Sequence, residues 1–206
     1  MSYDLIGDIH GCCQSLRTLL TRLDYTEIDG VYRHPSRTVV FLGDFIDRGP
    51  QQREVIELVR RMIDAGSAQS VMGNHEFNAI AYYTPDEANG DYLRPHSEKN
   101  LRQHRAFLEA YTDTPADYAD VISWFRTLPL WLDLGGIRVI HACWDVKLIN
   151  RIREFQDGSQ YIGDELLEAA SRKGQWQYTA LEALLKGKEI KLPNGASFRD
   201  KDGTLR

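Results

Sequence analysis

Four short polar segments of the sequence hold residue types that bind metal ions or phosphate. They are residues 7–11 (GDIHG), 43–49 (GDFIDRG), 73–76 (GNHE) and 140–142 (IHA). In the first segment, alternation along an extended chain places Asp8 and His10 on the same side. A carboxylate and an imidazole placed in this way can bind one metal ion. Mixed oxygen and nitrogen ligands favour Mn, Fe, Zn, Co or Ni over Ca or Mg.

Each polar segment follows a short apolar run that predicts a buried strand. These strands are expected at residues 3–6, 38–42, 70–72 and 137–140. The polar residues that follow them are Asp8, Asp44, Asn74 and His141. Because ligand sites of α/β sheets form beyond the carboxyl ends of the strands, four polar residues delivered to one edge predict a shared site.

Amphipathic patterns between the apolar runs predict helices, so the chain is expected to be an α/β protein. The expected helices cover residues 14–23, 52–65, 76–82, 101–111, 121–128, 165–172 and 178–186. Residues 130–140 predict a hairpin around Gly135 and Gly136. The polar segment 84–120 is expected to be an insertion over the core of a single domain spanning residues 1–206. His34, His96 and His104 lie in polar surroundings, so we expect them to be solvated.

Bulk composition favours one soluble enzyme-sized domain. The chain has 206 residues, 42% of them hydrophobic and 27% charged, which is enough for a sizeable core. The net charge of -5 argues against general nucleic-acid binding, although local basic pockets remain compatible with it. Three cysteines, two of them adjacent, make a poor disulfide framework. With no signal peptide and no apolar stretch long enough to span a membrane, the sequence predicts a cytoplasmic protein.

Taken in this order, the four segments resemble the calcineurin-like metallophosphoesterase superfamily. Within it, the chain is similar to the branch of the serine/threonine protein phosphatases and the bacterial dinucleoside tetraphosphatases. The resemblance is strong over residues 3–78, returns around residues 131–142 and is faint elsewhere. It implies an α/β fold in which a β-sandwich of two mixed sheets is flanked by helices. It also implies two divalent metal ions, with Mn expected first and Fe, Zn, Ni or Co as alternatives.

The resemblance implies a role for each metal ligand. Asp8 and His10 would bind the first metal, Asp44 would bridge both, and Asn74 and His141 would bind the second. The family pattern has one more histidine on the second metal, beyond the His141 segment, whereas this sequence has none after position 141. We therefore expect either that the C-terminus is incomplete, which its abrupt end favours, or that the second site is completed by another residue or water, or is weak.

The resemblance also implies the catalytic residues. His75 would be the general acid, oriented by Asp47, and Arg48 would clamp phosphate oxygens, with Arg53 as a further substrate-binding residue. This division is chemically sound, because two metals lower the pKa of a bridging water to ~7 and so need no protein base. An imidazole that protonates a poor leaving group typically contributes ~10²–10⁴-fold in rate. Arginine presents a planar fork that matches two phosphate oxygens.

The sequence thus predicts a metal-dependent hydrolase of phosphate monoesters or phosphoanhydrides, whose partner is a phosphorylated substrate. Residues 7–12 and Gly49–Pro50 resemble the dinucleoside tetraphosphatases. An acid at Asp47 beside Arg48 matches the serine/threonine phosphatases and the asymmetrically cleaving tetraphosphatases. One alternative is a non-catalytic binding or regulatory protein on a phosphatase scaffold, which the missing histidine would allow. The other is a phosphodiesterase or nuclease, which the acidic net charge disfavours.

Overall fold

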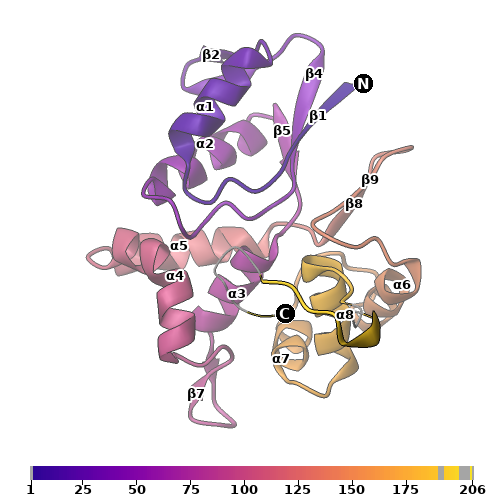
Figure 1. Cartoon of the computed structure of the whole chain (residues 1–206). Helices are drawn as coiled ribbons and strands as arrows, with labels where there is room; N and C mark the ends of the chain where they lie inside the picture. The colour runs from indigo at the N-terminus through magenta and orange to yellow at the C-terminus, as the bar shows by residue number, and fades with distance from the viewer. Residues whose placement is uncertain (1, 190–192, 200–204, 206) are drawn as a thin grey trace.

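The computed structural model describes residues 2–189, 193–199 and 205. A parallel three-stranded sheet forms the upper lobe in Figure 1, in the order β1 (Ser2–Ile6), β4 (Arg37–Phe41) and β5 (Ala68–Ser70). Ile6 pairs with Phe41, and Phe41 pairs with Ser70. The carboxyl ends of the three strands therefore lie level at one edge, and the chain leaves each strand at the same height.

Alternation along β4 separates the two faces of this sheet. Val39 and Phe41 join the main core with α1 (Cys13–Arg22) and α2 (Gln52–Asp64), whose apolar sides cover one face. Val40 points the other way and packs with Val139 of the hairpin β8 (Trp131–Asp133) and β9 (Arg138–Ile140). The expected α/β fold is thus confirmed, with the parallel sheet lying between two helices and an antiparallel strand pair. Among the described residues, neither of these two sheets is mixed, unlike those that the resemblance implied, because β1, β4 and β5 all run parallel and β8 and β9 run antiparallel.

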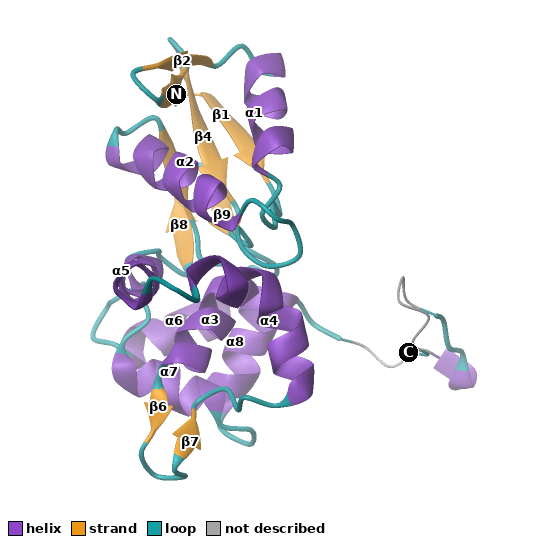
Figure 2. Cartoon of the chain, turned by 90° about the vertical axis from the view of Figure 1, so that its left-hand side faces the viewer, coloured by secondary structure: helices purple, strands orange, loops and turns teal. Residues whose placement is uncertain are grey.

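The lower lobe is built mainly from helices, as Figure 2 shows. These helices are α3 (Asn74–Tyr83), α4 (Glu98–Tyr111), α5 (Pro115–Arg126), α6 (Val146–Phe155), α7 (Asp164–Ser171) and α8 (Trp176–Lys186). Two hairpins and a short 3-10 helix complete the described elements: β2 (Thr26–Ile28) with β3 (Val31–Arg33), β6 (Pro85–Asp86) with β7 (Asp91–Tyr92), and η1 (Pro193–Gly195). No helix in the described residues is long and apolar enough to cross a membrane.

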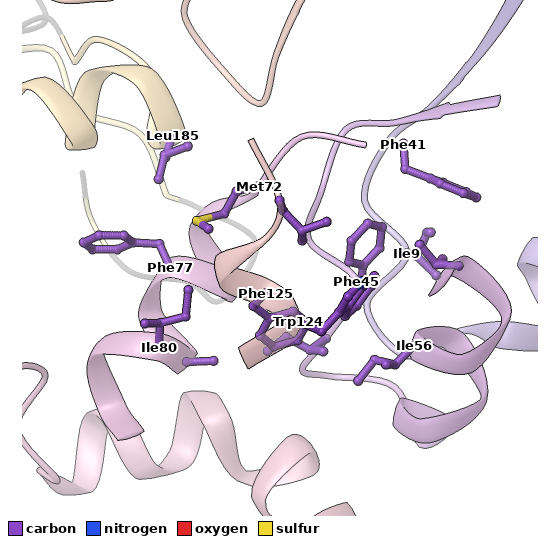
Figure 3. Close-up of a cluster of buried hydrophobic side chains, with 14 of the residues drawn as sticks. Ile9, Phe41, Phe45, Ile56, Met72, Phe77, Ile80, Trp124, Phe125 and Leu185 are labelled. Atoms are coloured by element: carbon purple, nitrogen blue, oxygen red, sulfur yellow. The ribbon is translucent and has the colours of Figure 1, made fainter. Parts of the chain in front are cut away.

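One continuous core joins the two lobes through an aromatic chain. The ring of Phe45 lies 5.9 Å from that of Phe41 in the sheet and 6.1 Å from that of Trp124 on α5 (Figure 3). Phe107 of α4 is fully buried in the same core. Segment 84–120 therefore packs on the rest of the chain. Because Phe45 directly follows Asp44, burial of this aromatic ring also anchors the polar loop that leaves β4.

Candidate metal centre

The loops that leave β1 and β4 are joined by backbone hydrogen bonds. The amides of Ile9 and His10 both donate to the Asp44 carbonyl at 3.0 Å, and the Gly49 amide donates to the His10 carbonyl at 2.9 Å. Four residues of these loops that carry a Cβ adopt positive φ angles, which are uncommon outside glycine. They are His10 (47°), Asp44 (55°), Asp47 (71°) and Arg48 (67°). Backbone strain concentrated in one place is typical of a functional site.

Glycine allows the loops after β4 and β5 to touch. Gly43 has φ +89°, and a Cβ added to it would lie 2.3 Å from the Gly73 amide nitrogen. The fully buried Glu76 holds the two loops together: one carboxylate oxygen accepts from the amides of Asp44 (2.8 Å) and Gly73 (3.0 Å), and the other from Phe45 (2.8 Å). Burial and the negative charge of Asp44 raise the pKa of Glu76 to about 7, against the effect of the Phe45 and Asp44 amides. Glu76 was part of a recognised motif, but its anchoring role depends on contacts that the sequence does not reveal.

The strand-end side chains converge on one carboxylate. Two groups have ligand atoms within 4.8 Å of one another: His10, Asp44 and His75, and Asp8, Asp44 and His141. Asp44 belongs to both. Its Oδ2 lies 3.9 Å from His10 Nε2, 3.8 Å from His75 Nε2 and 3.5 Å from His141 Nε2. The structure therefore brings together the charged and imidazole ligands that the sequence predicted, and it adds His75 to the first group.

The orientation of two histidines fits a bound cation. His10 Nδ1 is hydrogen-bonded to the Ile46 carbonyl at 2.8 Å, and His141 Nδ1 to the Leu42 carbonyl at 2.5 Å. Because a carbonyl only accepts, each Nδ1 must carry a proton, so the neutral form of each ring directs its Nε2 lone pair toward Asp44. His10 Nε2 is buried and has no hydrogen-bond partner in the described residues. A buried imidazole lone pair facing carboxylates, with the other nitrogen held by a carbonyl, is the arrangement of a metal ligand.

The charges of the cluster support the same use. Burial alone would raise the pKa of Asp44, but hydrogen bonding with His141 and the charge of His75 hold it below its usual value. Burial lowers the pKa of His10. It also opposes the charging of His141, yet Asp44 raises the pKa of that ring to about 9. Asp44 therefore stays ionised, and the neighbouring His141 imidazole carries the proton. A metal cation could take the place of that proton beside the carboxylate.

Asp47 binds two imidazoles. One carboxylate oxygen lies 2.5 Å from His75 Nδ1, and the other lies 2.8 Å from His104 Nδ1. These two contacts keep the pKa of Asp47 low despite its burial, which alone would raise it. His104 comes from α4 and is only 4% exposed. The expectation that His104 is solvated was wrong, because α4 packs against α2 and α5 and the ring is buried, where it contacts Tyr82 of α3 and Phe107.

The two candidate phosphate-binding arginines differ in position. Arg48 is exposed and lines a cleft together with Asp47, Asn74 and His75. The guanidinium of Arg53 instead donates to the Ala110 carbonyl (2.7 Å) and to Asp117 (2.9 Å), and it lies 4.2 Å from the Tyr111 ring centre. Arg53 does not line this cleft. The structure therefore does not bring Arg53 to the cluster, because its planar group fastens α2 to segment 84–120.

Comparisons with known proteins agree with this geometry. The calcineurin-like phosphoesterase family matches residues 1–192. An asymmetrical bis(5'-nucleosyl)-tetraphosphatase PrpE from Oceanobacillus iheyensis is 32% identical over 152 residues, which is 69% of this chain and 55% of that protein. The Bacillus subtilis PrpE is 45% identical over 76 residues, covering 36% of this chain and 31% of the relative. The chain thus spans about half, or less, of the length of these relatives. The crystal structure of a cold-active protein-tyrosine phosphatase from a psychrophilic Shewanella shares the fold, at 19% identity and TM-score 0.50, covering 88% of this chain and 53% of that one.

Proposed function

Because the chain belongs to the calcineurin-like phosphoesterase family, we propose that it is a metal-dependent hydrolase of phosphate monoesters or phosphoanhydrides. The observation that carries the proposal is the place of Asp44 in both ligand groups. One carboxylate shared by two groups is what a pair of metal ions requires of a bridging ligand.

Five residues would hold two divalent cations: Asp8, His10, Asp44, Asn74 and His141. When bound, such cations neutralise phosphate charge and lower the pKa of water to ~7. The donor set of carboxylate, amide and imidazole fits Mn, Fe, Zn, Ni or Co, and we propose Mn as the first ion to test. The geometry allows His75 to be either a metal ligand or the general acid, because its Nε2 lies as close to Asp44 as that of His10 does.

We assign His75 to proton transfer. Its Nδ1 is held by Asp47 at 2.5 Å, whereas His10 and His141 are held by neutral carbonyls. A carboxylate partner stabilises the positively charged ring that a general acid needs. Asp47 also fixes the direction of the ring, so that Nε2 faces the phosphate site beside Asp44. Arg48, at the mouth of the cleft, would bind two phosphate oxygens through its planar fork.

The substrate that we propose is a dinucleoside tetraphosphate, because the curated relatives are named asymmetrical tetraphosphatases. A phosphoprotein is the second candidate, supported by Asp47 beside Arg48, the pair that also resembles the serine/threonine phosphatases. We further propose that segment 84–120 is an insertion of a single domain, since its Phe107 shares the main core. The free cysteines, Cys12, Cys13 and Cys143, support a cytoplasmic location.

Hydrolysis of p-nitrophenyl phosphate with Mn²⁺ tests the proposal. We expect turnover with Mn²⁺ and none after EDTA treatment. Absence of turnover with every divalent metal tried would favour the non-catalytic scaffold. A strong preference for bis(p-nitrophenyl) phosphate would favour a phosphodiesterase or nuclease.

The role of His75 has its own test. The variant His75→Asn should lose ~10²–10⁴-fold in turnover of an alkyl phosphate, because that leaving group needs a proton, and much less with p-nitrophenyl phosphate. Mn²⁺ binding should be retained. His96→Asn is the matched control, since His96 is an exposed histidine of the same lobe, bonded to the Tyr82 carbonyl. Equal losses with both substrates, or loss of Mn²⁺ binding, would make His75 a metal ligand instead.

A further inference from the structure

A large cleft opens from the proposed centre into the helical lobe. It has a volume of about 1290 Å³ and reaches Asp47, Arg48, Asn74 and His75 at one end. Residues of α3, α4, α7 and α8 line it, and in Figure 1 the first two helices lie on the left and the last two on the right. The cleft is far larger than one phosphate group needs, so it has room for a part of a ligand that lies beyond the reacting phosphate.

The cleft concentrates positive charge in an acidic protein. Seven lysines and arginines line it against three carboxylates, whereas the whole chain has a net charge of -5. Beyond Arg48, the cations are Arg94, Lys99, Arg102, Arg105, Lys173 and Lys186. A concave surface lined by one sign of charge attracts ligands of the opposite sign. The cleft therefore suits an anion with several charges.

Most of these cations have no carboxylate partner among the described residues. Lys186 pairs with Glu182, and Arg94 donates to the neutral amide oxygen of Gln103 at 2.9 Å. The other five, Arg48 included, form no ion pair or hydrogen bond through their side chains in the described part of the chain. By contrast, Arg60 and Arg126, which lie outside the cleft, pair with Asp120 and Asp164. The cleft thus holds cations whose charge the fold itself leaves uncompensated.

Arg94 and α4 arrange this charge along the cleft. Arg94 precedes α4 and is half-buried, so its guanidinium has already lost part of its hydration shell. Burial lowers the pKa of Arg94, and the negative charge of the nearby Asp47 opposes this effect. Arginine nevertheless stays protonated in proteins. On α4, Lys99, Arg102 and Ala106 follow at spacings of three and four residues and line the cleft, which places them on one helix face. A ligand lying along this wall would contact successive cations.

We propose that the cleft is a polyphosphate subsite, in which Arg94, Lys99 and Arg102 bind the phosphates that lie beyond the phosphate undergoing attack. The position of the reacting phosphate rests on the proposed function, whereas the affinity of the cleft for a polyphosphate does not. The subsite explains how the same centre would prefer a phosphoanhydride chain over a monoester. A single phosphate reaches Arg48 alone, and a chain of phosphates reaches the cations of α4 as well.

Calorimetric titration with sodium tripolyphosphate tests the subsite directly. The full chain is stripped of metal and dialysed, because divalent ions would themselves bind the probe. We expect tripolyphosphate to bind at least about tenfold more tightly than orthophosphate. The double variant Lys99→Gln/Arg102→Gln removes two exposed cations of the cleft, and the Kd for tripolyphosphate should rise about tenfold or more. Arg94→Gln should weaken binding in the same direction.

The matched control removes the same charge elsewhere. Arg22→Gln/Lys147→Gln alters two exposed cations that do not line the cleft and have no side-chain partner in the described residues. It should leave the Kd within about twofold of the wild type. Three results would overturn the proposal: equal binding of tripolyphosphate and orthophosphate, equal weakening by both double variants, or tighter binding of an acidic phosphopeptide than of tripolyphosphate.

Kinetics separate this proposal from the assignment of activity. With Mn²⁺, the ratio of kcat/KM for diadenosine tetraphosphate to that for p-nitrophenyl phosphate should fall about tenfold in Lys99→Gln/Arg102→Gln. If the wild type hydrolyses neither substrate while the binding results hold, the hydrolase assignment fails and the subsite stands. If hydrolysis is present but neither binding nor the ratio depends on Arg94, Lys99 and Arg102, the subsite alone is refuted.

Discussion

Replacing Gly43 by alanine tests whether close contact between the loops after β4 and β5 holds the centre together. The added Cβ would lie 2.3, 2.6 and 2.9 Å from atoms of the Gly73 and Met72 backbone, so no flexible side chain can move to relieve the clash. The φ of +89° adds strain for any residue with a Cβ, about 1–2 kcal/mol. Gly66→Ala is the matched control, because Gly66 also has a positive φ (+68°) but has nothing within 4 Å of an added Cβ.

The difference between the two variants measures the contact alone. Overpacking a rigid site costs about 1–3 kcal/mol. Moving the loops apart also weakens the bonds that Glu76 accepts from Asp44 and Phe45, at roughly 1.5–3 kcal/mol for each charged bond that is lost. We therefore expect Gly43→Ala to lower the free energy of unfolding by about 2.5–6 kcal/mol, from the sum of overpacking and one lost bond, beyond the effect of Gly66→Ala. Urea denaturation of the metal-free protein at constant pH provides the measurement. A difference below about 1 kcal/mol with unchanged slope would refute the inference that this contact is rigid.

Two further predictions concern residues of segment 84–120 and their partners. His104→Phe removes one of the two imidazoles that Asp47 binds, so His75 should be less well oriented. Turnover of an alkyl phosphate should then fall about tenfold more than that of p-nitrophenyl phosphate. Equal losses with both substrates would show that His104 acts only through folding. Arg53→Gln should lower Tm through its lost contacts with Ala110, Asp117 and Tyr111, while KM for p-nitrophenyl phosphate stays unchanged. Arg48→Gln is its comparison and should raise that KM about tenfold; a raised KM for Arg53→Gln would return this residue to the substrate site.

The first two strands were predictable because each apolar run stops close to a glycine: β1 ends at Ile6, directly before Gly7, and β4 ends at Phe41, two residues before Gly43. The third was expected at residues 70–72, but β5 covers Ala68–Ser70. The amide of Met72 donates to the Pro129 carbonyl at 2.8 Å, so the chain has already left the sheet and turned toward the helical lobe. Such a switch of hydrogen-bond partner depends on a segment more than fifty residues away, which a local pattern cannot contain.

Helix α6 was missed although the sequence carries a signal for it, because Val146, Ile149 and Ile152 recur every three residues and the last two are buried. A second signal is the cap at Asp145, whose carboxylate accepts from the amides of Lys147 and Leu148. Capping aspartates also occur in turns, so the residue type alone does not decide between a helix and a turn.

The candidate ligands were predictable because each belongs to a compact motif at the end of a strand. Their surroundings were not. His104 reaches Asp47 across 57 positions of sequence, and Arg53 reaches Asp117 across 64. Both contacts are made by segment 84–120, whose polar composition conceals which side faces inward. The sequence therefore indicated the chemistry, and tertiary packing decided which residues support it.

The most direct test of the central claim is the Mn²⁺ stoichiometry of the metal-stripped chain, measured by calorimetry and electron paramagnetic resonance. Because Asp44 belongs to both ligand groups, Asp44→Asn should abolish the spin-coupled pair and weaken both binding events, whereas Asp8→Asn should affect chiefly one. The wild type should bind two ions, and their coupling should depend on Asp44. Unchanged stoichiometry in Asp44→Asn, or equal effects of the two variants, would contradict a centre built around a shared carboxylate.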